Sequence, residues 1–197
     1  MAEGKQYAAV ATFAQSDEAS TVEVPGDVAE VIAALDEIVA KYDMGDAISE
    51  EDQAIVKAYL PAIGVDSSEL SQDNALVGEG SYAFDKSELG CDLHAEGRMG
   101  CRGAGEGRIE WWADMAVSKT GGEARIANFK FTFQGAGFGV GPTGVMKLIY
   151  KRDFSRDFNA SESAAGSFFD RYTLTQWGFY YTSTCEVLTD KGTIVVR

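Results

Sequence analysis

The sequence has only one histidine, His94, in 197 residues. Any mechanism of the Ser/His/Asp or Cys/His type would have to use this side chain. Cys91 and Cys101 lie near it in the sequence, but on an extended strand both would point away from the face of His94. We therefore expect no metal site and no catalytic residue. Three cysteines do not make a disulfide framework, so we expect buried thiols, with a bond from Cys185 to one of the others as the alternative.

The chain also lacks any apolar run near the roughly 20 residues that a membrane-spanning helix needs. Its first residues, MAEGKQYAAVATFAQ, have no basic segment followed by an apolar run, so we expect no signal peptide. This predicts a cytoplasmic protein or one secreted by a leaderless route. A net charge of −14 disfavours nucleic acid and anionic lipid as partners. No cofactor is expected, because GAGEG at 103–107 precedes a strand and not a helix.

What the sequence does contain falls into two regions. A hydrophobic share of 45% and an aromatic share of 11% are typical of a globular protein with one main core. Residues 1–75 carry 16 acidic and 3 basic side chains, against 15 and 14 in residues 76–197. Glycine is distributed in the opposite way, with 4 of its 22 residues in the first region. We place the boundary near residue 74.

Two amphipathic helices are predicted in the acidic N-terminal segment, residues 1–74. Over about 26–42 the apolar residues recur every three or four positions, and Asp27 with Glu30 resembles a capping box. A second apolar stripe covers about 49–60, where Ser49 can cap the helix and Pro61 follows it. Both stripes need a surface to cover. That surface is either the rest of the protein or a partner, for which the helices would be a lid or a docking element.

In the second region, residues 75–197, the apolar period changes to two. Residues 108–118 are apolar at odd positions and largely polar at even ones, as in a strand with one buried face. The same alternation marks segments that begin at Leu76, Cys91, Phe129, Met146 and Trp177. No helical segments alternate with these strands, which excludes a parallel βαβ fold. The predicted fold is mainly β, a closed antiparallel barrel of about eight strands preceded by the acidic, mostly α-helical segment.

The stretch FQGAGFGVGPTG, residues 133–144, is the most unusual part of this region. Its apolar residues change from odd to even positions between Phe133 and Ala136. Such a change predicts a β-bulge or a sharp bend near residues 134 and 135, with the glycines on the outside of the strand. The following segment, residues 151–166, alternates charges with Phe154 and Phe158 and is predicted to be a long loop. The two phenylalanines would either tuck it onto the barrel rim or make it a rim or lid for a ligand.

Four features of residues 76–190 resemble the small virulence-associated-protein barrels of bacterial pathogens. They are GSYAF at the first strand, FQGAGFGVGPTG followed by VMKLIY, a mid-chain loop with aspartates, and a late turn, TDKG. The resemblance implies a closed eight-stranded antiparallel barrel with glycine-rich strands. It also implies action outside the producing cell, in host compartments, with no recognised catalytic residues to carry over.

Three functions follow as alternatives. The first is a non-catalytic barrel that binds a hydrophobic small molecule, a lipid or a protein partner, as a secreted effector or virulence-associated protein would. The second is a barrel cyclase or isomerase that folds a hydrophobic substrate by shape. The third is a filled barrel that acts through its helices as a protein-interaction module. The candidate ligand-binding residues, on the barrel lining or rim, are Tyr82, Trp111, Met115, Tyr150, Phe154, Trp177 and Tyr181.

Overall fold

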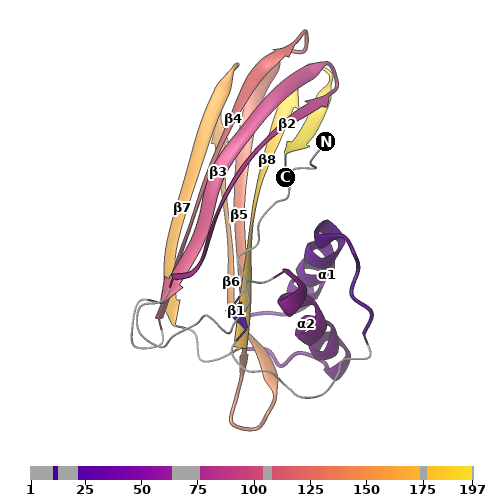
Figure 1. Ribbon diagram of the computed structural model, residues 1–197, viewed down its shortest axis with the longest axis vertical. Helices are drawn as coiled ribbons and strands as arrows, with labels where there is room; N and C mark the ends of the chain where they lie inside the picture. Colours follow the sequence, from indigo (N-terminus) through magenta and orange to yellow (C-terminus); the bar gives the residue numbers. More distant parts are fainter. Residues whose placement is uncertain (1–10, 13–21, 64–75, 104–107, 174–176, 197) are drawn as a thin grey trace.

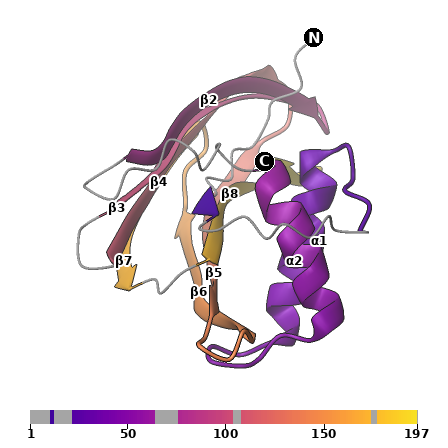
Figure 2. The ribbon, with the colours of Figure 1, turned by 60° about the horizontal axis from the view of Figure 1, so that its bottom comes forward.

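Two antiparallel β-sheets lie face to face, and two helices cover the outside of one of them (Figures 1 and 2). The arrangement is that of a computed structural model, which describes residues 11–12, 22–63, 76–103, 108–173 and 177–196. The helices are α1 (Val28–Lys41) and α2 (Glu50–Ile63), against predicted ranges of about 26–42 and 49–60.

The four-stranded sheet has the order β2-β3-β4-β7, and the five-stranded sheet has the order β1-β8-β5-β6 with β9 also paired to β8. The first sheet consists of β2 (Leu76–Glu88), β3 (Cys91–Gly103), β4 (Arg108–Gly122) and β7 (Ser163–Thr173). The second consists of β1 (Ala11–Thr12), β5 (Ile126–Val140), β6 (Met146–Phe158), β8 (Trp177–Thr189) and β9 (Gly192–Val196). All the pairings are antiparallel.

The main core lies between the two sheets and takes alternate residues of strands such as β4 and β5. On β4 the odd-numbered residues of 109–117 are buried, and the even-numbered residues of 112–118 are partly exposed. On β5 the side chains of Phe129, Phe131 and Phe133 are fully buried. The period-two alternation in the sequence is thereby confirmed for these strands.

Neither sheet closes into a barrel, so the predicted closed barrel behind a mostly helical segment is wrong. At the edge where closure would occur, β6 and β7 belong to different sheets, and aromatic side chains join them. The Tyr150 and Tyr172 rings stack with centroids 3.7 Å apart, and the Phe154 and Phe168 centroids are 5.1 Å apart. A strand has one inward face in a sandwich and in a barrel alike, so alternation did not distinguish the two folds.

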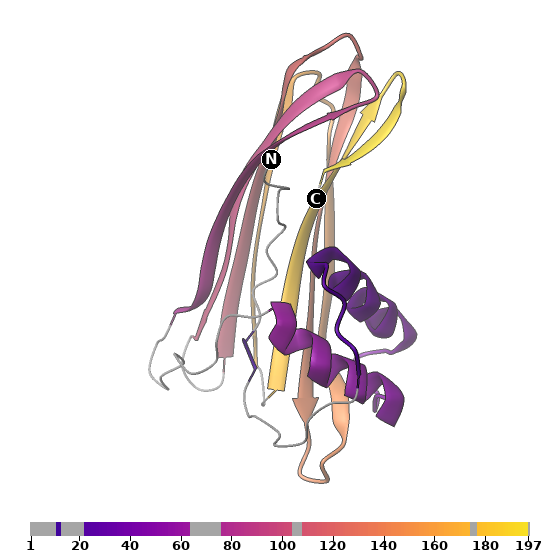
Figure 3. The ribbon, with the colours of Figure 1, turned by 45° about the vertical axis from the view of Figure 1, so that its right-hand side comes forward.

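The apolar stripes of α1 and α2 pack on the outer face of the five-stranded sheet (Figure 3). The backbone between the helices also pairs with the start of β6, where Gly45 N donates to the Leu148 carbonyl (2.7 Å) and Ile48 N to the Met146 carbonyl (2.9 Å). The buried contacts between the helices and the five-stranded sheet include Leu35, Val56, Leu60, Phe138, Met146, Leu148 and Tyr180.

In the part of the chain that the structure describes, no helix has the length and apolar character needed to cross a membrane.

Polar contacts also attach α1 to this sheet. The Tyr180 hydroxyl donates to the Asp36 carboxylate (2.7 Å). The Lys151 ammonium donates to the carbonyl oxygens of Val39 and Tyr42, at 2.9 and 3.2 Å. Those oxygens lie at the C-terminal end of α1, where helical carbonyls lack partners within the helix. β6 therefore supplies a cationic cap for α1.

The predicted bulge at residues 134 and 135 of β5 is not present. Pairing of β5 with β8 is continuous over residues 128–139. The irregularity lies toward β6, where the register shifts between Gly137 and Phe138 and leaves Ile149 without a partner residue in that ladder. The bulge therefore lies on the neighbouring strand.

The apolar positions of β5 change parity because each face of the strand meets a different layer. Phe133 faces the four-stranded sheet, whereas Ala136 and Phe138 face the helices. Gly135 lies on the inner face, and a Cβ placed there would be 2.8 Å from Cδ1 of Tyr181. Gly135, expected on the outside of the strand, thus leaves room for aromatic rings inside.

Residues 151–166, predicted to be a loop, instead form most of β6 and the beginning of β7. Phe154 and Phe158 turn inward, toward Phe168 and Phe131 respectively, and residues 151–157 are otherwise largely exposed. β6 is an edge strand, and charged side chains on edge strands oppose pairing with other chains. The alternation of phenylalanine with charge is therefore the pattern of an edge strand.

A buried carboxylate joins the end of α1 to the start of α2. Asp52 accepts hydrogen bonds from the Lys41 ammonium (2.9 Å) and the Tyr42 hydroxyl (2.7 Å). Burial opposes ionisation of Asp52, but these hydrogen bonds outweigh it and hold its pKa below the ordinary value. The ionised form therefore stabilises the helix pair.

We expect Asp52→Asn to lower the free energy of unfolding at neutral pH by about 1–3 kcal/mol. The folded pKa lies below the unfolded one, so this contribution is complete above about pH 4 and is lost as the pH falls through the folded pKa. The difference between variant and wild type should shrink over that range in urea unfolding. Glu37→Gln removes the same charge from an exposed site on α1 and is the control. A difference independent of pH would contradict this role.

Candidate functional site

Three of the candidate ligand-binding residues bind each other between the sheets. The Trp111 and Tyr181 rings stack with centroids 4.2 Å apart. Trp111 Nε1 donates to the Tyr150 hydroxyl (2.7 Å), which in turn donates to Asp170 Oδ2 (2.7 Å). Burial, and for Tyr150 the bond to Asp170, raises the pKa of both tyrosines, so they stay protonated. The aromatic residues expected around a ligand therefore form a bonded interior cluster.

The other four candidates are dispersed. Tyr82 and Met115 are buried in the four-stranded sheet, at its inner face. Phe154 lies at the edge between β6 and β7 and is 37% exposed. Trp177 pairs with Gly139 across β8 and β5, and its side chain lies outside the described residues.

Tyr82 crosses the inner face of β3 at a glycine. Its hydroxyl donates to the Asp114 carbonyl (3.2 Å) and lies 3.3 Å from the Ser183 hydroxyl on the other sheet. Burial raises the pKa of Tyr82 to about 12. A Cβ on Gly97 would overlap both the Tyr82 hydroxyl and the Asp114 carbonyl oxygen. Gly97 is therefore required for the aromatic side chain to span β3.

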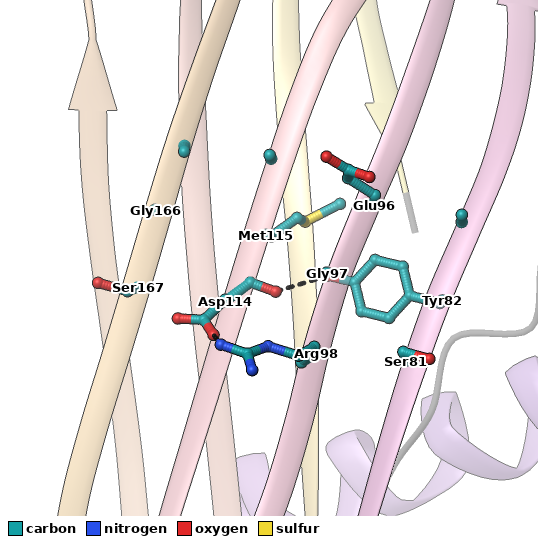
Figure 4. Close-up of a pocket in the computed structure, with 12 residues that line it drawn as sticks. Ser81, Tyr82, Glu96, Gly97, Arg98, Asp114, Met115, Gly166 and Ser167 are labelled. Atoms are coloured by element: carbon teal, nitrogen blue, oxygen red, sulfur yellow. Dashed lines mark hydrogen bonds and ion pairs between the residues drawn. The ribbon is translucent and has the colours of Figure 1, made fainter.

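On the opposite face of the same strands there is a hollow of about 710 Å³ (Figure 4). The backbones of Tyr82, Gly97, Met115 and Gly166 form its floor, and each strand contributes the residues on either side of these. We call it the outer hollow. Its outward side chains form two cross-strand rows, Ser81-Arg98-Asp114-Ser167 and Ala83-Glu96-Ala116-Ala165.

A smaller hollow of about 360 Å³ continues the outer hollow along the strands. At outward positions it shares Glu96, Ala116 and Ala165 with the outer hollow and adds His94, Ser118 and Ser163. The three new residues belong to the next row, which begins on β2 with Asp85. Short side chains on β4 and β7 therefore leave an extended depression across three rows.

Most charges in these rows are paired with each other. Arg98 donates to Asp114 Oδ2 (3.0 Å), as Figure 4 shows, and His94 Nδ1 is hydrogen-bonded to Asp85 (2.8 Å). Glu96 is exposed and has no hydrogen-bonding or ionic partner among the described residues. Within the same part of the chain, no side-chain hydrogen bond occupies the hydroxyls of Ser81, Ser118, Ser163 or Ser167. The depression therefore offers one free carboxylate and several free hydroxyls.

Beyond the row of Arg98, two aromatic residues lie side by side on the same face. Trp112 and Phe169 are directly paired across β4 and β7, and Phe169 is 59% exposed. The Arg102 guanidinium lies 5.9 Å from the centroid of the Trp112 ring. We call Trp112 and Phe169 the aromatic row.

An ion-pair cluster ends this face of the sheet. Glu110, only 3% exposed, accepts hydrogen bonds from Arg171 and from Arg102 Nε (2.8 Å). The bonds from Arg171 and then Arg102 hold the pKa of Glu110 below its ordinary value. Two guanidinium groups thus share one carboxylate next to the aromatic row, which leaves the cluster with one net positive charge.

The sequence did not predict a site on this outer face, because the candidate residues were placed on the lining or rim of a closed barrel. A signal was available on β7, where Ser163, Ala165 and Ser167 occupy outward positions that on an exposed strand usually carry longer side chains.

Cys91, Cys101 and Cys185 are buried, and all three are free thiols. Within the described ranges, no three His, Cys, Asp or Glu side chains gather so as to hold a metal ion.

No protein-family model, curated protein or solved structure matches this chain. The residues themselves are therefore the basis for any functional proposal.

Proposed function

We propose that this protein is a non-catalytic binding protein that holds a polar ligand of little net charge in the outer hollow. The observation that carries the proposal is the set of free polar groups there, Glu96 and the serine hydroxyls, beside Arg98 and His94, which are bonded to Asp114 and Asp85. A few placed polar groups in a concavity are typical of ligand sites.

Two observations support a ligand that is not anionic. Arg98, the cation inside the hollow, is already paired with Asp114. The protein as a whole carries a net charge of −14, which repels anions at long range. An uncharged molecule with several hydroxyl groups can donate to Glu96 and exchange hydrogen bonds with the serines without meeting this repulsion.

The nucleophiles of the chain support a role without catalysis. Burial raises the pKa of Cys91, of Cys101 and of Cys185, the last to about 12, so none is a thiolate at neutral pH. The single histidine, His94, is bonded to Asp85 at the surface, and among the described residues no hydrogen bond joins it to Ser118, its neighbour on β4.

An NMR titration of the full chain tests the proposal, with myo-inositol and glucose as polar probes, citrate as an anion and decanol as an apolar probe. We expect the two polyols to shift the amide signals of residues 96–98, 114–116 and 165–167, and citrate and decanol to leave them unchanged. Ala165→Trp, which fills the hollow from an exposed position, should abolish the shifts. Thr193→Trp, exposed on β9, is the control.

The opposite pattern would overturn the proposal. If decanol shifts the amides around Trp111 and Tyr181 while the polyols shift nothing, the ligand is apolar and lies between the sheets.

A further inference from the structure

The aromatic row lies directly beyond the outer hollow, on the same face of the same two strands. Trp112 and Phe169 are each two residues from the pair Asp114 and Ser167, which line the hollow. Residues on one face of a strand are about 7 Å apart, so the aromatic row is about 13 Å from the middle of the hollow at Ala116. A ligand that reaches both must be elongated along β4 and β7.

We propose that the ligand is a neutral oligosaccharide, and that the aromatic row is its second subsite. The inference rests on the proposed function and assigns the ligand its chemical class. A pyranose ring has a face of C–H groups and an edge of hydroxyls. The exposed Phe169 ring presents an apolar surface for the first, and Glu96 with the free serines offers partners for the second.

The surroundings of the aromatic row argue against the other ligand chemistries. A lipid would need a continuous apolar surface, but this one is a single row between Arg98–Asp114 and the cluster around Glu110. An anion would need a free cation, but Arg98 is paired with Asp114, and Arg102 and Arg171 share Glu110. The one net positive charge left in that cluster is outweighed by the protein's net charge of −14. A chain of neutral sugar units needs neither a continuous apolar surface nor a free cation.

The subsite predicts a dependence on ligand length. A monosaccharide can occupy the hollow or the aromatic row but not both, whereas a hexasaccharide can occupy the two together. We expect at least one of cellohexaose, maltohexaose and chitohexaose to bind the full chain about 10- to 100-fold more tightly than its monosaccharide. Phe169→Ala should weaken hexasaccharide binding about 3- to 10-fold, the range expected for one aromatic contact. Its effect on binding of the monosaccharide at the hollow should be negligible.

Calorimetry with wild type, Phe169→Ala, Phe169→Leu and the control Leu188→Ala, an exposed apolar residue on β8, tests the inference. Phe169→Leu keeps an apolar side chain but lacks the ring, so it should behave like Phe169→Ala. Equal hexasaccharide affinities for wild type and Phe169→Ala would overturn the inference and leave the hollow as a binding site. The inference also fails, with the proposed function intact, if polyols bind the hollow and no hexasaccharide binds more tightly than its monosaccharide. If neither sugars nor polyols shift the amides of the outer hollow, the proposed function fails as well.

Discussion

Replacing Trp111 with alanine should lower the free energy of unfolding by about 3–5 kcal/mol, the range for large aromatic side chains deleted from a packed core. Trp111 is fully buried and stacks on Tyr181. It also packs against Phe168, with ring centroids 4.6 Å apart, and donates to Tyr150. The cavity would open between the sheets, where the surrounding rings belong to three different strands.

The neighbouring residue provides a matched control. Trp112 has the same side chain one position further along β4, but it points to the outer face and is partly exposed. We expect Trp112→Ala to cost about 1 kcal/mol or less, as is usual for a surface substitution that removes some packing. Urea unfolding of both variants measures the difference. Equal losses for the two would contradict the assignment of opposite faces on β4.

A third variant separates the two contributions of Trp111. Trp111→Phe keeps an aromatic ring in the interior cluster but removes the Nε1 donor to the Tyr150 hydroxyl. We expect it to recover more than half of the stability lost in the alanine variant. The remaining loss would combine the smaller ring volume with a hydrogen bond worth about 1 kcal/mol.

The contrast between these two tryptophans shows which part of the fold the sequence made predictable. Alternation along β4 assigned Trp111 to the core and Trp112 to the outer face, since side-chain direction depends only on position along the strand. Which strands pair is set by contacts between segments far apart in sequence. β7 pairs with β4 and not with β6, the strand that precedes it in the sequence. The alternation of residues along one strand does not determine which strand it pairs with.

The glycine-rich part of β5 shows a second limit of sequence interpretation. A change in apolar parity has two physical origins, a bulge in the strand or a change in what covers its two faces. On β5 it is the second, because the helices cover Ala136 and Phe138 on the outer face. The sequence pattern predicts the helices and locates the glycines, but it does not show that the helices pack on this part of β5.

The candidate site was the least predictable part because it is defined by side chains that are short or free. Ala116 and Ala165 were unremarkable as single residues, and they line a hollow only because β4 and β7 pair in the observed register. Glu96 is exposed on β3, and in the sequence alone it cannot be told from an ordinary solvated acid. Its lack of a partner, beside a paired Arg98, became visible only in three dimensions.

The floor of that hollow depends on Gly97, and Gly97→Ala is the second substitution for which we expect a large effect. The new methyl group would overlap the Tyr82 hydroxyl and the Asp114 carbonyl oxygen. A side chain can turn away, but a backbone carbonyl held within a ladder cannot move without disturbing the pairing of β3 with β4. Forcing extra volume into a packed site typically costs 1–3 kcal/mol, and the backbone overlap places Gly97→Ala at the upper end, about 3 kcal/mol.

Gly141→Ala is the matched control, and its effect should have the opposite sign. A Cβ there would meet only the Val145 carbonyl oxygen, at an ordinary 3.9 Å. The φ angle of Gly141 is not among the positive ones, so alanine fits the existing backbone. Alanine at such a position restricts the unfolded chain and commonly stabilises a protein by about 0.4–1 kcal/mol.

Combining Gly97→Ala with Tyr82→Ala tests which of the two overlaps decides the cost. If the Asp114 carbonyl is the main obstacle, removing the tyrosine ring will not restore stability, and the double variant will be less stable than either single one. The amide signals of residues 96–98 and 114–116 should also move, because the same backbone forms the floor of the outer hollow. If the double variant is as stable as Tyr82→Ala alone, β3 and β4 tolerate a side chain at Gly97. In that case Tyr82 alone requires the glycine.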